Sequence, residues 1–159
     1  MENTCNAIKD CILNDMQPYL DAESPQDERL IIPQADAIIV GVADLSRYNQ
    51  KVVCAIVPGK TEESEGNIAD AEEEHSITVS FMFTGKEYPR LVSEMFRYAE
   101  AFKAMLRDNP TMGLQALSTT IGSTEYFPDA GSIEKQMTAA EIDITVRTHK
   151  EVTADDVFA

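Results

Sequence analysis

The chain has 159 residues, of which 43% are hydrophobic, so it can bury the core of one domain and is not disordered throughout. Its 13 basic and 28 acidic residues give a formal net charge of −15. This charge excludes nonspecific binding to nucleic acid or to an anionic membrane, because both would be repelled. It leaves two interpretations open, high solubility and a functional electrostatic role.

Targeting segments and a disulfide framework are not expected. Residues 1–16 have no basic stretch followed by an apolar run, so we expect no signal peptide. No stretch approaches the roughly 18 consecutive apolar residues that cross a bilayer. Cys5, Cys11 and Cys54 are an odd number without framework spacing, which favours buried thiols in a reducing compartment.

The first half of the chain predicts one helix followed by strands. Apolar residues three and four apart over residues 3–20 predict an amphipathic helix that ends before Pro25. Residues 29–44 are rich in β-branched side chains and predict one or two strands, broken near Pro33. The apolar run 51–57 predicts a buried strand that ends at the following Pro-Gly pair.

Residues 60–75 differ from the rest of the chain in composition, with seven acids and one lysine. Too little apolar surface is present to offset the entropy of ordering them. We therefore expect a mobile acidic loop or a frayed helical turn. Its acids are Glu62, Glu63, Glu65, Asp70, Glu72, Glu73 and Glu74.

The second half gives the clearest patterns. Residues 75–85 alternate between apolar and polar side chains, which predicts a strand with Ile77, Val79, Phe81 and Phe83 on its buried face. Residues 88–108 predict an amphipathic helix with a proline in its first turn. Residues 116–127 and 139–148 predict two further strands, and 151–159 a loose acidic tail.

Together these elements predict a single α+β domain over residues 1–150, in the order α-β-β-β-α-β-β. We expect two helices packed on one face of a four- to five-stranded, mostly antiparallel sheet, an α/β sandwich. The other sheet face then stays free for a neighbouring protein.

Short matches to catalytic and ligand-binding motifs are incomplete. The segment Pro58–Thr61 ends like a phosphate-binding loop, but Cys54 stands where the first glycine is required. Ser132 and Lys135 have the spacing of a serine nucleophile and its lysine activator, without the companion motifs. The acids of residues 62–74 do not fall at the intervals of a calcium loop. Cysteines and histidines are not clustered for zinc, and we expect no cofactor, metal or catalytic residues.

In the order of its predicted elements and in its local sequence, the chain resembles the tail terminator proteins of tailed bacteriophages. These are also described as tail completion or head–tail joining proteins. The resemblance covers roughly residues 5–150. A short amphipathic helix leads into strands, and ITVSFMFTG then enters the helix YPRLVSEMFRYAEAFKAML. A strand pair follows, separated by YFPDAG and closed by AAEIDITVRT.

The resemblance implies a structural subunit of the virion tail or neck, assembled in the host cytoplasm as a homohexameric ring, and not an enzyme. Such a ring caps the tail tube, ends its polymerisation and meets the head connector, while double-stranded DNA passes through without specific binding. The charged helix face and the free sheet face would form the two sides of the head-to-tail contact between neighbouring ring subunits. The resemblance itself assigns no residue. The charge and alternation patterns indicate a subunit or tail-tube interface with Arg90, Glu94, Arg97, Lys103 and Arg107 on the helix, and Asp143, Thr145 and Arg147 on the sheet.

Two alternatives remain open at this stage. One is another phage neck or tail-assembly adaptor of related fold. The other is an enzyme whose site is assembled from distant positions, which a deep polar pocket near His75 or His149 would favour.

Overall fold

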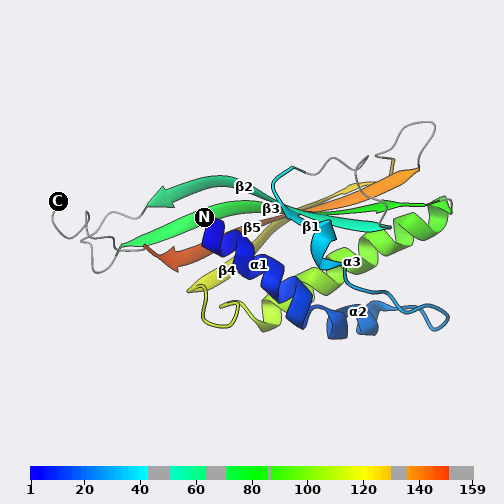
Figure 1. Cartoon of the computed structure of the whole chain (residues 1–159), viewed down its shortest axis with the longest axis horizontal. Coiled ribbons are helices and arrows are strands. Elements are labelled where there is room, and N and C mark those ends of the chain that lie inside the picture. Colours follow the sequence, from blue (N-terminus) through cyan, green and yellow to red (C-terminus); the bar gives the residue numbers. More distant parts are fainter. Residues whose placement is uncertain (43–50, 64–70, 86, 130–135, 151–159) are drawn as a thin grey trace.

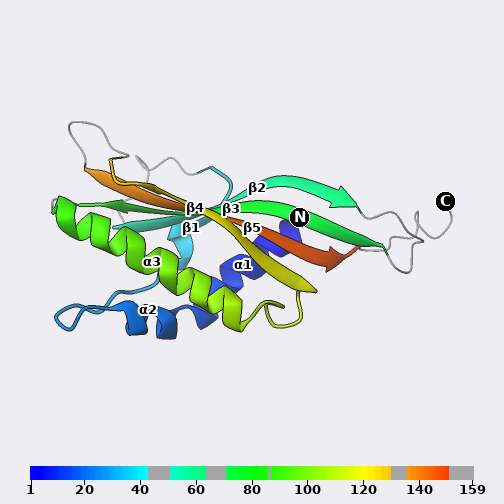
Figure 2. The same cartoon turned by 180° about the vertical axis from the view of Figure 1, so that it is seen from behind.

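The computed structural model describes residues 1–42, 51–63, 71–85, 87–129 and 136–150, which form an α+β fold (Figures 1 and 2). The predicted fold class and order of elements are confirmed, except that the first helix is divided in two. In chain order the elements are α1 (Glu2–Asp15), α2 (Gln17–Glu23), a single 3-10 turn (Ala35–Ala37), β1 (Ile38–Val40), β2 (Val52–Glu63), β3 (Glu72–Thr84), α3 (Tyr88–Asp108), β4 (Ser118–Phe127) and β5 (Met137–His149).

The five strands form one sheet in the order β1-β2-β3-β5-β4. Only β1 and β2 run parallel, and the other three neighbouring pairs are antiparallel. Figures 1 and 2 show α1, α2 and α3 beneath the same face of the sheet. Within the ranges that the structure describes, the opposite face is covered by no helix, and we call it the helix-free face.

The core forms where β3 and β5 face α3. The four apolar residues predicted to point inward from β3 are at most 2% exposed, which confirms the alternation. Phe81 meets Phe102 edge to face, with 5.5 Å between ring centroids. Phe83 meets Tyr98 in the same way at 5.0 Å. Such pairs add about 0.5–1.5 kcal/mol to the stabilisation from burial alone.

The predicted helix over residues 3–20 is interrupted at Met16. Pro18 stands in the first turn of α2, where its missing N–H costs nothing, but it could not continue α1 without losing a backbone hydrogen bond. Ile8, Ile12 and Leu20 are nevertheless fully buried, so both helices present one apolar face to the core. The pattern therefore predicted the buried face correctly and missed the break.

Most of the strand predicted over residues 29–44 is replaced by an extended segment held by α2. Gln17 donates from its amide nitrogen to the Leu30 carbonyl at 2.8 Å and accepts from the Ile32 N–H at 3.0 Å. The Leu30 N–H donates to the Ser24 hydroxyl at 2.9 Å. Because these backbone groups are satisfied by side chains, they need no neighbouring strand.

The strand predicted over residues 51–57 continues beyond the Pro-Gly pair as part of β2. Its register against β3 shifts between Pro58 and Thr61. Gly59 lies against the β3 backbone, where an added Cβ would stand 2.8 Å from the Ser76 carbonyl oxygen. The predicted end of this strand was wrong, because the pair forms an irregularity inside a ladder and does not end it.

The three cysteines are buried free thiols, as predicted. Burial raises the pKa of Cys11 to about 11, with a smaller contribution from neighbouring aspartates, and burial alone raises the pKa of Cys54 further. A thiol that stays protonated at neutral pH is a poor nucleophile. These side chains therefore act as small apolar groups of the core.

Candidate interaction surfaces

The charged side of α3 is less open than its sequence pattern predicts, because α2 packs beside it. Arg97 donates from Nε to the Ser93 hydroxyl at 3.1 Å, and its guanidinium also meets the Glu23 carbonyl at the end of α2. Lys103 is paired with Glu100 at 2.9 Å, and only 12% of its side chain is exposed. Arg107 is exposed near the end of the helix. The predicted basic side of the interface is therefore largely occupied within the subunit.

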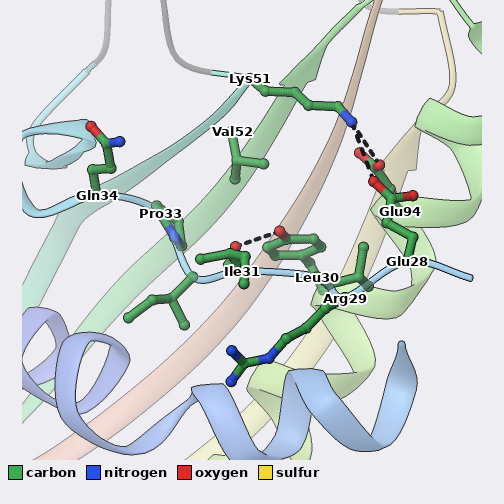
Figure 3. A pocket seen from close by; sticks show the side chains of 11 residues that line it. Glu28, Arg29, Leu30, Ile31, Pro33, Gln34, Lys51, Val52 and Glu94 are labelled. Carbon is green, nitrogen blue, oxygen red and sulfur yellow. Dashed lines mark hydrogen bonds and ion pairs between the residues drawn. The ribbon is translucent and has the colours of Figure 1, made fainter. Parts of the chain in front are cut away.

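Glu94 was predicted on the outward side of α3, and this was wrong, since the residue is only 4% exposed. Its Oε1 lies 3.2 Å from Lys51 Nζ (Figure 3). The same oxygen lies 3.7 Å from Arg90 Nε. Glu28 pairs with the same two cations from the segment after α2. This ion network joins α3 to β2 and to the segment before β1.

The network borders a pocket of about 270 Å³ between the extended segment 28–34 and α3 (Figure 3). Apolar Leu30 and Val52 line it together with the charged groups. The Tyr98 hydroxyl donates to the Ile31 carbonyl at 2.6 Å, so this polar group is satisfied within the subunit. The described residues that line the pocket include no serine, threonine, cysteine or histidine, and its charged groups, Lys51 among them, are held in ion pairs.

Glu94→Leu is expected to leave the free energy of unfolding within about 1 kcal/mol of wild type, or to raise it, because Glu94 Oε2 is buried and has no hydrogen-bond partner among the described residues. The half-exposed Lys51 and Arg90 keep Glu28 and water as partners. Urea unfolding of Glu94→Leu and Glu94→Ala measures this, and we expect alanine to be the less stable of the two because it leaves a cavity. Glu100→Leu, at a half-exposed position of the same helix, is the matched control. A loss above about 3 kcal/mol for Glu94→Leu would mean that the carboxylate is essential to the fold.

The acidic segment 60–75 was predicted as a mobile loop, and at both of its ends this was wrong. Glu62 and Glu63 belong to β2 and lie directly opposite Glu74 and Glu73 of β3. Glu72 begins β3 and pairs with Arg147 of β5. Glu65 and Asp70 lie outside the described residues.

Like charges opposite one another destabilise a sheet, so this pairing depends on cations supplied by other positions. Lys60 Nζ lies 2.7 Å from Glu62, and Lys150 Nζ lies 3.4 Å from Glu63. Arg147 provides a third cation, toward Glu72. Only Lys60 belongs to the acidic segment itself, so local composition could not indicate the pairing.

A buried histidine lies beneath the same strand ends, on the face toward the helices. His75 is 1% exposed, with Nδ1 at 2.9 Å from the Thr61 hydroxyl and Nε2 at 3.1 Å from the Thr148 hydroxyl. Glu73 Oε2 lies 3.4 Å from Nε2. Burial and the positive chain N-terminus lower the pKa of His75, against the opposing effect of Glu73. His75 therefore ties three strands together as a neutral side chain at pH 7.

On the helix-free face, the candidate residues of β5 lie as predicted. Asp143 and Arg147 are exposed, and Thr145 between them is partly exposed. Asp143 accepts hydrogen bonds from Thr78 of β3 at 2.8 Å and from Ser123 of β4 at 3.0 Å. The carboxylate is thus held in place by both neighbouring strands.

The acidic strand ends enclose a hollow of about 350 Å³, lined by four glutamates and Arg147. Neither His75 nor His149 lines it. Among the described residues, no group of three or more histidines, cysteines or acids is arranged to hold a metal ion. No helix in those ranges is both long and apolar enough to cross a membrane. The hollow is therefore a strongly acidic part of the surface.

The comparisons with protein-family models and with curated protein sequences gave no match for this chain. Its function must therefore be argued from the sheet, its edges and its charges.

Proposed function

We propose that this chain is a structural subunit of a phage or phage-like tail. In this proposal it forms a ring, a homohexamer by the resemblance, that caps the tail tube, ends its polymerisation and provides the surface for the head connector. It acts in the virion neck after assembly in the host cytoplasm, and it performs no catalysis.

The single observation that supports this most is the one-sided layering of the fold. The three helices of the described ranges lie on one side of the sheet, with α2 packed against α3 (Figures 1 and 2). The helix-free face exposes Asp143 and Arg147 of β5. A sheet layered in this way can present its remaining face and edges to other subunits. The resemblance over residues 5–150 adds the ring as the form of assembly.

The charge of the helix-free face suits a channel for DNA. Along β3 and β5, Glu72, Glu74, Glu141 and Asp143 share this face with Arg147 as the cation between them. A lumen lined by excess acid repels phosphate, so DNA passes without binding. We therefore propose that the helix-free face lines or borders the lumen, in place of the subunit contact expected from sequence, and that the edges of the sheet meet the other subunits.

Assembly on tail tubes tests the proposal. Light scattering coupled to size exclusion should give a mass close to six subunits, either for the protein alone or after its release from tubes. Co-sedimentation with purified tail tubes should show binding at the tube end, and added protein should stop tube growth. A strict monomer at high concentration that also fails to bind tubes would contradict the proposal.

A different neck or tail-assembly adaptor is the second candidate, and the same surfaces would serve it. Electron microscopy of labelled particles separates the two, since a terminator lies at the junction of tube and head. An enzyme with a dispersed site is the third candidate, and the two pockets described above do not favour it, since neither is lined by His75 or His149.

A further inference from the structure

We infer that copies of this chain join edge to edge, with β4 of one copy pairing antiparallel to β1 of the next, so that a continuous sheet runs through the assembly. The inference rests on the proposed ring and assigns its contact surface. In this inference the strand edges take the place of the charged side of α3 as the contact surface, because Glu94 is buried and Arg97 and Lys103 have partners within the subunit.

The two margins of the sheet differ from the rest of the molecule in charge. β4 contains one charged residue, Glu125, in its ten positions, and residues 37–42, around β1, contain none. The whole chain carries a net charge of −15. Two copies therefore meet with least repulsion at these two margins.

Exposed apolar side chains gather at the same two margins. Val40 and Val42 on the β1 side are 41% and 86% exposed. On the β4 side Phe127 is 37% exposed. Phe96 of α3, 46% exposed, packs against Tyr126 with its ring tilted and 4.8 Å between ring centroids. The backbone N–H and C=O groups at the edge of a sheet are a template for a further strand, and exposed apolar side chains beside them favour the pairing.

The end of β2, by contrast, is protected against pairing with strands of other chains. Beyond Ile56, β2 extends past its pairing with β1, and there it carries Pro58, a register shift, Lys60 and two glutamates. These are the features by which sheets resist pairing with other chains. β4 has an irregularity between Ile121 and Thr124 but neither proline nor lysine.

The topology fixes the direction of the contact. β4 lies at the end of the strand order opposite to β1, at the near margin in Figure 2, while β1 lies at the near margin in Figure 1. Across the sheet, from β2 through β3 and β5 to β4, neighbouring strands run in opposite directions, whereas β1 runs in the same direction as β2. Repeating the sheet in one orientation therefore sets β4 antiparallel to the next β1. Because two different surfaces meet, the contact is head to tail and can close into a ring.

Two variants, each blocking one margin, test the contact. Thr120→Asp places a charge in β4, and Val40→Asp places one in β1, each at a position that is exposed in the subunit. Each should raise the protein concentration required for assembly at least tenfold, as measured by light scattering. Leu114→Asp, at an 89% exposed position in the loop before β4, adds the same charge outside both edge strands and should assemble like wild type.

Mixing the two variants decides the geometry. Each retains the edge that the other has lost, so a 1:1 mixture should form a dimer of one copy of each and nothing larger. Dimers of Val40→Asp alone would indicate symmetric pairing of β4 with β4 and would overturn the head-to-tail contact. Unchanged assembly of both variants would overturn the edge contact while leaving the ring intact.

Failure of the ring itself is recognised in the wild type, which would then neither assemble nor bind tubes. Should a variant misfold, as judged by circular dichroism, hydrogen exchange of the wild-type protein replaces it. Amides of residues 118–127 and 37–42 should exchange more slowly in the assembly than in the dilute monomer, and equal rates would overturn the inference.

Discussion

Phe81→Ala is expected to lower the free energy of unfolding by about 3–5 kcal/mol, because Phe81 is fully buried and its removal leaves a cavity between β3 and α3. The side chain contacts Phe102 edge to face and also lies 6.1 Å from the Tyr98 ring. Loss of its ring removes both aromatic contacts together with the buried apolar area. Urea unfolding followed by circular dichroism measures the change.

Phe96→Ala is the matched control, since it deletes the same ring from a position that is 46% exposed. It should cost about 1 kcal/mol or less, mostly from its contact with Tyr126. Both variants are measured at one low protein concentration, so that assembly does not add to the apparent stability. Equal losses would mean that the β3–α3 layer is not the centre of the core.

The fold could be predicted where side chains alternate or repeat with a single period. The buried face of β3, the bounds of α3 and the inward set of β5 all follow from such patterns. Patterns of this kind are local, and the sheet and helix that they describe bury one face each. The fold class therefore followed from sequence.

What the sequence missed depends on partners that are distant in the chain. The segment before β1 looks like a strand, but Gln17 and Ser24 satisfy its backbone. The acidic ends of β2 and β3 look disordered, but Arg147 and Lys150 lie beside them in the fold. In each case the structure is decided by partner residues that are distant in the chain, which a local sequence pattern does not show.

The candidate surfaces divide in the same way. On β5, strict alternation placed Asp143 and Arg147 on the open face correctly. On α3, the polar stripe did not reveal that Glu94 turns toward Lys51, which comes from another element. The uncharged margins at β1 and β4 were visible as composition, but only strand order shows that they are margins.

Acidification below about pH 6.5 is expected to destabilise the protein through His75. Its pKa in the folded protein is lowered, chiefly by burial, whereas the unfolded chain has the ordinary value near 6.5. The unfolded state therefore binds a proton first as pH falls, and stability decreases from about pH 6.5 down to the folded pKa. One proton gives a slope of at most about 1.4 kcal/mol per pH unit, and stability is unaffected by this group above that window.

His75→Gln should remove this slope between about pH 6.5 and the onset of carboxylate titration near pH 5. Glutamine can still hydrogen-bond Thr61 and Thr148, so part of the strand contact is kept at neutral pH. The control is His149→Gln, an exposed position at the end of β5 that leaves His75 unchanged and should retain the slope. Because His75 joins β2, β3 and β5 under the acidic strand ends, its protonation should open that end of the sheet first. Protection factors from hydrogen exchange, which correct for the slower intrinsic exchange at lower pH, should then fall at residues 61–63 and 72–75 between pH 7 and pH 5.5 while the α3 amides stay protected. A uniform loss of protection would contradict a local role for His75.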